Sequence, residues 1–273
     1  MTERTLHFIS GLPRSGSTLL SALLRQNPRF HAHMSSPVAG LVGDLLNGMS
    51  ASNEYALFIG DEQRQRILRG LFEQYYGAEF AAPVIFDSNR AWCTRMALLH
   101  SLFPQSKVIA CVREVPWIID SIERLVQRNA FSPSAIFNFQ AGGTVYSRAE
   151  GVAGADGMLG FAYNALKEAF YGEHASRLLL VRYESLVSEP QAVLDGIYDF
   201  IGEPVFAHDL HNVQFSDAHE FDRRAGTPGL HDIRPSVEAR PRSSLLPPDL
   251  FARFSNDAFW QHPQHNTRGT RIL

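Results

Sequence analysis

Residues 11–18, Gly-Leu-Pro-Arg-Ser-Gly-Ser-Thr, combine the residue types that bind a phosphate group. They follow the short apolar run 6–9 and precede an apolar stretch with helical spacing, which predicts a strand–loop–helix unit. Backbone N–H groups at the start of such a helix attract anions. Gly11 and Gly16 let the backbone bend and approach a ligand without a Cβ in the way. The segment is therefore a candidate nucleotide-binding loop.

The side chains of this loop indicate which nucleotide it binds. Ser15, Ser17 and Thr18 supply hydroxyl donors. A loop for nucleoside triphosphates carries lysine directly after the second glycine, whereas here Ser17 occupies that position and the positive charge lies at Arg14. The pattern favours an anionic nucleotide other than ATP. The alternative is a chance match in a turn before a helix.

A second anion site is predicted independently. The apolar run 107–112 is typical of a buried parallel strand, and it ends on Arg113. Parallel strands present ligands at their carboxyl ends, so Arg113 is expected at the same edge of the sheet as the first loop. Ser121 lies on the helix that follows, and the two residues together form a candidate phosphate pocket. The alternative for Arg113 is an ordinary ion pair, with Glu114 as the nearest partner.

Taken together, these motifs resemble the sulfotransferase family, whose donor is 3′-phosphoadenosine 5′-phosphosulfate (PAPS). Residues 13–20 resemble its 5′-phosphosulfate loop, Arg113 and Ser121 its 3′-phosphate motif, and 180–187 a strand and turn that family members share. The likeness is strongest to the tyrosylprotein and carbohydrate branches and to bacterial peptide-tyrosine sulfotransferases of the Rax type. The resemblance implies PAPS binding by Pro13, Arg14, Ser15, Gly16, Ser17, Thr18, Arg113, Ser121 and Tyr183.

A late segment of the family folds back over the nucleotide. In this chain the stretch 211–242 is rich in Arg, His, Gly and Pro. By resemblance, the candidates for nucleotide contacts are Arg223, Arg224, Thr227, Gly229 and Arg234. The alternative is a plain solvated loop.

The catalytic base departs from the family pattern, because the expected glutamate and lysine are absent. Asp87, at the carboxyl end of a predicted strand, is the first candidate base, with a helix N-cap as its alternative. His33 is the second candidate base, since histidine titrates near neutral pH, and a solvated loop histidine is its alternative. Arg90, beside Arg14, is the candidate for stabilising the departing phosphate, or else an ordinary surface arginine. No metal is expected, and His208 with His211 lack a third ligand nearby.

The whole chain of 273 residues alternates strand and helix patterns. This predicts an α/β three-layer sandwich with a parallel central sheet, similar to P-loop NTPases. One domain over 1–260 and a flexible tail over 261–273 are expected. The segment 129–156 is interpreted as a surface loop, with a helix around 134–140 as the alternative. The expected strands are 6–10, 83–87, 107–112 and 177–183, and the expected helices 18–26, 38–49, 61–76, 93–103, 117–128, 157–174, 190–201 and 250–260.

The charge and composition of the chain limit the classes of binding partner that are expected. The net charge of −3 and the isoelectric point near 6.4 do not favour a nucleic-acid partner. No apolar stretch predicts a membrane span, and a cytoplasmic enzyme is expected. The expected partners are PAPS and a hydroxyl acceptor: a peptide tyrosine, a carbohydrate or a small metabolite. A P-loop kinase or nucleotidase and a non-catalytic nucleotide-binding protein are the two alternatives.

Overall fold

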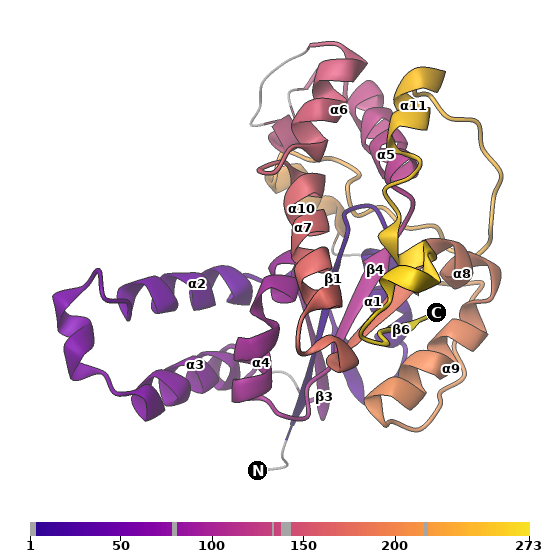
Figure 1. Cartoon of the computed structure of the whole chain (residues 1–273). Helices are drawn as coiled ribbons and strands as arrows, with labels where there is room; N and C mark the ends of the chain where they lie inside the picture. The colour runs from indigo at the N-terminus through magenta and orange to yellow at the C-terminus, as the bar shows by residue number, and fades with distance from the viewer. Residues whose placement is uncertain (1–3, 78–80, 133, 138–142, 216–217) are drawn as a thin grey trace.

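The computed structural model describes residues 4–77, 81–132, 134–137, 143–215 and 218–273. In these ranges a single sheet of parallel strands runs through the molecule in the order β2-β3-β1-β4-β5-β6 (Figure 1). Its strands are β1 Thr5–Gly11, β2 Phe30–Ala32, β3 Val84–Ser88, β4 Val108–Val112, β5 Leu178–Arg182 and β6 Arg271–Ile272.

Helices cover both faces of this sheet. The α-helices are α1 Ser17–Leu24, α2 Val38–Gly48, α3 Asp61–Tyr75, α4 Met96–Leu102, α5 Val115–Arg128, α6 Val145–Ala153, α7 Met158–Tyr171, α8 Tyr183–Ser188, α9 Pro190–Ile201, α10 Ala218–Arg224 and α11 Pro248–Phe254. The short 3₁₀ segments are η1 Glu54–Phe58, η2 Arg90–Arg95, η3 Ala135–Phe137, η4 Ala175–Arg177, η5 Phe259–Gln261 and η6 Pro263–His265. Helices α2 and α3 extend together to one side of the sheet (Figure 1).

Alternating side chains on the central strands divide the core into two layers. Phe8 of β1 packs with α3, α4 and α7 on one face, and its neighbour Ile9 packs with α1 and α9 on the other. Both faces are covered, so all five residues of β4 are buried. The predicted three-layer α/β sandwich with a parallel, P-loop-like sheet is therefore confirmed.

The strands that follow β1 in the chain are added first on one side of it and then on the other. Its neighbours are β3 on one side and β4 on the other, so the chain leaves the carboxyl end of β1 at a topological switch point, where open α/β sheets bind ligands. Gly11 makes this exit possible, with φ at +103° and its Cα hydrogen facing β4. A Cβ there would lie 2.2 Å from the carbonyl oxygen of Cys111. The candidate nucleotide loop starts at this point.

Several segments differ from the sequence prediction. The expected surface loop over 129–156 contains α6, and of the alternative helix over 134–140 the structure shows only η3, because residues 138–140 lie outside the described residues. The expected tail over 261–273 instead ends in β6, which pairs in parallel with β5, and Thr270 just before this strand is buried. The backbone N–H of Arg182 donates to the carbonyl of Leu273 at 3.0 Å, so hydrogen bonding to an open sheet edge holds this end. Of the described helices, none has the length and apolar character needed to cross a membrane.

Candidate functional site

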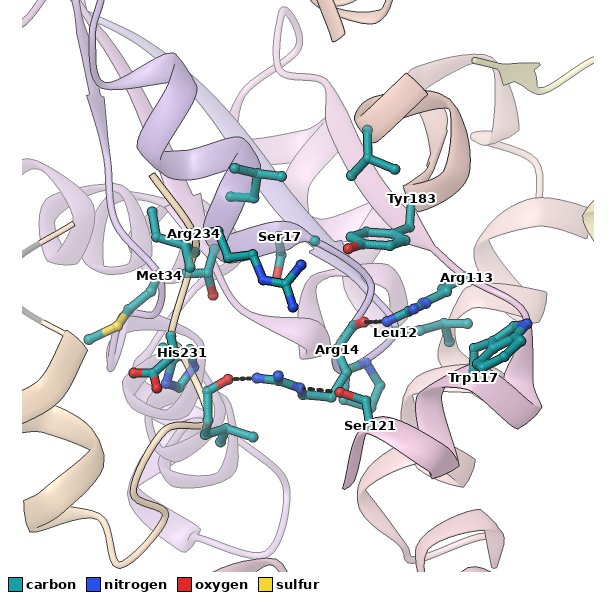
Figure 2. Close-up of a pocket in the computed structure, with 18 of the residues that line it drawn as sticks. Leu12, Arg14, Ser17, Met34, Arg113, Trp117, Ser121, Tyr183, His231 and Arg234 are labelled. Atoms are coloured by element: carbon teal, nitrogen blue, oxygen red, sulfur yellow. Dashed lines mark hydrogen bonds between the residues drawn. The ribbon is translucent and has the colours of Figure 1, made fainter. Parts of the chain in front are cut away.

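A cavity of about 1130 Å³ opens at the carboxyl ends of β1, β4 and β5. The loop after β1, one face of α5, helix α8 and most of residues 229–242 line it (Figure 2). Residues 229–242 are called the strap below, because they pass over the cavity without regular secondary structure. The cavity brings together both candidate anion sites and most of the late segment.

The loop presents the start of α1 to the cavity. Gly16 precedes the helix with φ at +96°, a left-handed conformation that favours glycine, and a Cβ there would lie 3.0 Å from the Tyr183 ring. Pro13, Ser17 and Thr18 line the cavity as expected. No side chain caps the N-terminus of α1, so its first N–H groups are available to an anion.

Ser15 does not reach the cavity, contrary to the expectation for its hydroxyl. The side chain is fully buried and donates to the carbonyl oxygens of Leu12 and of Cys111, the latter at 2.9 Å. These bonds fix the turn of the loop against β4. Ser15 therefore shapes the loop, and its hydroxyl is not a ligand group.

Arg14 joins three parts of the site. Its Nε donates to Ser121 Oγ at 3.0 Å, and its Nη1 donates to the Leu230 carbonyl of the strap (Figure 2). Burial, and to a smaller extent the charge of Arg113, lowers the pKa of Arg14 to about 10, so the group is still a cation at neutral pH. In the described part of the chain no carboxylate forms an ion pair with it.

Arg113 extends from the end of β4 into the same cavity. Its guanidinium carbon lies 4.2 Å from the centre of the Tyr183 ring, and its Nη1 donates to the Arg14 carbonyl at 3.3 Å. Burial lowers the pKa of Arg113. Its buried Nε has no hydrogen-bond acceptor among the described residues, and no ion pair to Glu114 forms there. An unused buried donor beside a partly open cavity fits an anionic ligand.

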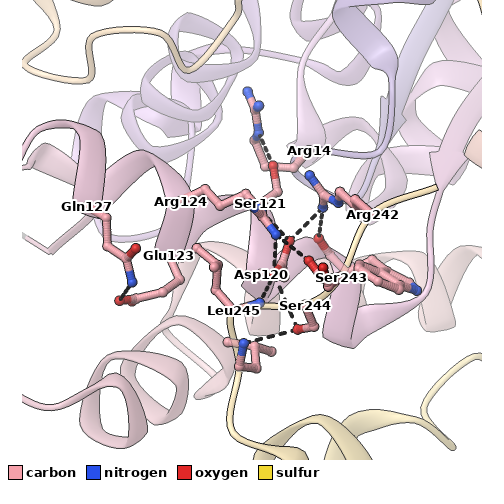
Figure 3. A network of polar contacts seen from close by, with 12 residues as sticks. Arg14, Asp120, Ser121, Glu123, Arg124, Gln127, Arg242, Ser243, Ser244 and Leu245 are labelled. Atoms are coloured by element: carbon pink, nitrogen blue, oxygen red, sulfur yellow. Dashed lines mark hydrogen bonds and ion pairs between the residues drawn. The ribbon is translucent and has the colours of Figure 1, made fainter. Parts of the chain in front are cut away.

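A buried carboxylate on α5 holds the far end of the strap (Figure 3). Asp120 is fully buried and forms ion pairs with Arg124 at 2.9 Å and with Arg242 at 2.8 Å. The backbone N–H of Leu245 donates to the same carboxylate at 2.7 Å. Since Ser121 is the next residue of α5, this network ties the strap directly to the predicted phosphate pocket.

Only some of the candidates in the segment 211–242 lie at the cavity. Gly229 lines the cavity. Arg224 lies on α10 with 77% of its side chain exposed and forms an ion pair with Glu220 at 2.6 Å, because α10 turns this face toward solvent. Thr227 is buried outside the cavity lining. The structure therefore does not bring Arg224 and Thr227 to the cavity with the other predicted nucleotide-binding residues.

Asp87 is placed in the core, not in the cavity. Its carboxylate accepts from Ser36 Oγ at 2.7 Å, Tyr76 Oη at 2.6 Å and Trp92 Nε1 at 2.7 Å, and it is completely shielded from solvent. Burial raises the pKa of Asp87, while the three hydrogen bonds lower it. Since three donors occupy its oxygens and it does not line the cavity, the structure does not place Asp87 where the predicted base would act.

Of the other two catalytic candidates, Arg90 lines the cavity and His33 does not. His33 does not line the cavity, since its ring packs on His31 and Phe215 at centroid distances of 4.9 and 6.4 Å. Arg90 does line the cavity at the end of β3, as expected. Burial lowers the pKa of Arg90, and no described carboxylate forms an ion pair with it.

The cavity wall carries a large excess of positive charge. Of the described lining residues, eight are arginines and three are acids. The arginines are Arg14, Arg90, Arg113, Arg124, Arg128, Arg234, Arg240 and Arg242, and the acids are Glu184, Asp232 and Glu238. The electrostatic potential of such a wall favours a multiply charged anion, and fixed cations in a confined space can stabilise negative charge that develops during a reaction.

Sequence reasoning missed a carboxylate–histidine pair at the cavity. Asp222 of α10 and His231 of the strap lie 2.5 Å apart between Oδ1 and Nδ1. The spacing of these two residues in the sequence matches no helical or strand period, so no sequence pattern indicated that they form a pair. No three His, Cys, Asp or Glu side chains of the described ranges gather as metal ligands would.

Known proteins share this architecture. The sequence profile described as "Sulfotransferase family" matches residues 7–208. No curated protein sequence is similar enough to count as a match. The solved sulfotransferase domain from the curacin biosynthetic pathway is 18% identical, with 92% of this chain and 96% of that chain covered at a TM-score of 0.54. The sulfotransferase domain from the Synechococcus PCC 7002 olefin synthase is 19% identical, with 93% and 94% covered at 0.50. A sulfotransferase from Alicyclobacillus acidocaldarius is 12% identical, with 100% and 98% covered at 0.52. At such low identity these structures show a shared fold.

Proposed function

Because the chain belongs to the sulfotransferase family, we propose that it transfers the sulfuryl group of PAPS to a hydroxyl group. The acceptor is a tyrosine phenol, a carbohydrate or a small metabolite. In this proposal arginines and backbone amides, and no metal, neutralise the donor. The eight arginines of the cavity wall support that part of the proposal.

One observation carries the proposal: the residues of both candidate anion sites line one cavity. The uncapped start of α1 at Gly16 is the first, and Arg113 with Ser121 is the second. A nucleotide with phosphate groups on both its 5′ and 3′ positions needs two such sites. The buried, unused Nε of Arg113 is a donor that the second phosphate would satisfy.

Different residues of the cavity serve nucleotide binding and sulfuryl transfer in this proposal. In the proposal, Gly16, Ser17 and Thr18 hold the 5′ end of PAPS, which supplies the activated sulfuryl group. Arg14 lies between the two anion sites and serves both. Arg90, a cavity cation without a described ion-pair partner, stabilises the charge that develops on the leaving phosphate. Positioning and fixed charge supply most of the rate enhancement in transfers of this kind.

Binding experiments test the nucleotide assignment. Calorimetry would compare adenosine 3′,5′-bisphosphate (PAP), AMP and ATP on the wild type, Arg113→Ala and Arg224→Ala. Loss of a charged hydrogen bond costs about 1.5–3 kcal/mol, so Arg113→Ala is expected to weaken PAP binding roughly 10- to 150-fold. AMP lacks the 3′-phosphate, so its affinity should hardly change. Arg224→Ala is the matched control, because that arginine is exposed and paired with Glu220.

Turnover with labelled PAPS then tests the reaction. A panel of a tyrosine peptide, an amino-sugar oligosaccharide and small alcohols and phenols covers the three acceptor classes. Label in one acceptor class supports the proposal and names the class. Preference for ATP over PAP would instead favour a kinase, and PAP binding without transfer to any acceptor would favour a non-catalytic nucleotide-binding protein.

A further inference from the structure

One imidazole lines the cavity in the part of the chain that the structure describes, and it belongs to His231. His231 and Met34 lie on one side of the cavity in Figure 2, and Arg113 lies on the other. His231 follows Leu230, whose carbonyl oxygen accepts from Arg14. The histidine therefore follows a residue that contacts the loop arginine, and it lies across the cavity from Arg113.

A buried carboxylate fixes this ring. Asp222 is 0% exposed, and its second oxygen accepts from the backbone N–H of His231 at 2.7 Å. Since a carboxylate oxygen accepts, Nδ1 of His231 carries the hydrogen and Nε2 keeps its lone pair. Phe221 packs against the ring at a centroid distance of 5.6 Å. Tautomer and orientation are thus set before any ligand binds, which a general base requires.

The other acids of the cavity are less suited to accept a proton from a hydroxyl. Glu184 follows Tyr183 on the Arg113 side, where burial raises the pKa of Glu184 and Arg113 lowers it. Asp232 pairs with His219 at 3.4 Å, and Glu238 pairs with Arg240, both at the exposed surface. Among the described lining groups, His231 is the one whose lone pair a buried partner orients.

We propose that His231 is the general base of the transfer and that Asp222 is its positioning residue, an inference that rests on the proposed function. His231 Nε2 takes the proton of the acceptor hydroxyl while the acceptor oxygen forms its bond to sulfur. The bond from sulfur to the bridging oxygen breaks, and its electron pair leaves with the 5′-phosphate of PAP. Asp222 stabilises the imidazolium, which then releases its proton to water.

Three variants test this assignment: His231→Gln, Asp222→Asn and the control His219→Gln, a neighbouring histidine that is 82% exposed. Each is assayed with the acceptor on which the wild type is fastest. General-base loss typically costs about 10²- to 10⁴-fold, so that drop in kcat is expected for His231→Gln. PAP affinity should stay within about threefold, less than 1 kcal/mol. Asp222→Asn should lower kcat in the same direction, and His219→Gln should leave it unchanged.

Two further readouts separate a base from a structural histidine. Imidazole ¹⁵N spectra of the ligand-free wild type, assigned by the signal lost in His231→Gln, should show hydrogen on Nδ1 and none on Nε2. The wild-type kcat should fall as acid protonates the base, and His231→Gln should lack this limb. Among the described residues, Asp222 bonds to the ring, Asp232 and His219 share a small pocket with His231, and Arg14 contacts the preceding residue, so the profile of His219→Gln must match the wild type.

Each result decides a specific point. Wild-type kcat in His231→Gln, loss of PAP binding in that variant, or a hydrogen on Nε2 would each overturn the base assignment while leaving the sulfotransferase proposal standing. A wild type that binds PAP but transfers to no acceptor removes the proposed function, and this inference with it. If Asp222→Asn fails to fold, His231→Gln and the spectra decide alone.

Discussion

Replacing Asp87 by alanine is expected to destabilise the fold while each folded molecule keeps its activity. The carboxylate accepts from Ser36, Tyr76 and Trp92 at distances of 2.6–2.7 Å. These donors lie before α2, after α3 and in η2, so one buried group joins three segments to β3. The substitution therefore acts on how the α2–α3 pair is attached to the sheet.

The size of the effect follows from the donors left behind. Each buried donor without an acceptor costs about 1–3 kcal/mol, so the three donors together set an upper bound of about 9 kcal/mol. We expect about 3–5 kcal/mol for Asp87→Ala, because the three donors lie close enough to rearrange partly around one another. At about 2–4 °C per kcal/mol for a domain of roughly this size, the melting temperature should fall by roughly 6–20 °C.

The assay combines urea unfolding with sulfuryl transfer from labelled PAPS, normalised to the folded fraction at the assay temperature. Asp87→Asn keeps one acceptor oxygen but turns an N–H₂ group toward a donor, so its cost should be smaller, about 1–3 kcal/mol. Tyr76→Phe removes one donor, and combining it with Asp87→Ala should cost less than the sum of the two. An unchanged unfolding midpoint together with lost transfer in Asp87→Ala would refute this reasoning and return the carboxylate to the reaction.

Two further predictions concern stability. Burial, with a smaller contribution from Lys107, lowers the pKa of His7 from 6.5 to about 4. The unfolded chain therefore takes up a proton first, and about 3 kcal/mol of stability present above pH 6.5 should be lost as the pH falls toward 4. Urea titrations of the wild type and His7→Gln at pH 7 and pH 4.5 check this, and equal pH slopes would contradict it. Deleting residues 271–273 removes β6 and the acceptor of the Arg182 N–H, so the unfolding midpoint should fall. A midpoint within error of the full-length chain would mean that β6 adds nothing to the sheet.

The sequence predicted the features that depend on local hydrophobic patterns. Apolar runs and breaks gave four of the strands and the parallel sandwich, and the carboxyl-end rule placed the loop after β1 and Arg113 at one edge. The same rule failed for Asp87, because it names the end of a strand but not the face. In β3 the alternation places Asp87 on the sheet face of Ile85, toward Trp92 and away from the loop. Both faces are buried in such a sheet, so burial patterns in the sequence do not separate them.

What the sequence could not predict depends on contacts between distant segments. Ser15 turns inward because the carbonyl of Cys111 lies within hydrogen-bond distance, 2.9 Å, across the sheet. Strand β6 is two residues long and exists only because β5 offers it an open edge. The Asp222–His231 pair forms where the chain folds back after α10, in a stretch without periodic signal.

The contacts of Arg14 connect the predicted 3′-phosphate pocket to the strap that carries the proposed base. Its guanidinium donates to Ser121 in the predicted 3′-phosphate pocket and to Leu230, the residue before the proposed base. If the proposed nucleotide places a phosphate on Arg14, that phosphate competes with these acceptors for the same N–H groups, so its binding should change how the strap is held at the His231 end. The other end stays fixed, because Asp120 is buried beneath Arg124 and Arg242 and does not face the cavity. Movement of the strap on nucleotide binding should therefore be concentrated around Leu230 and the proposed base.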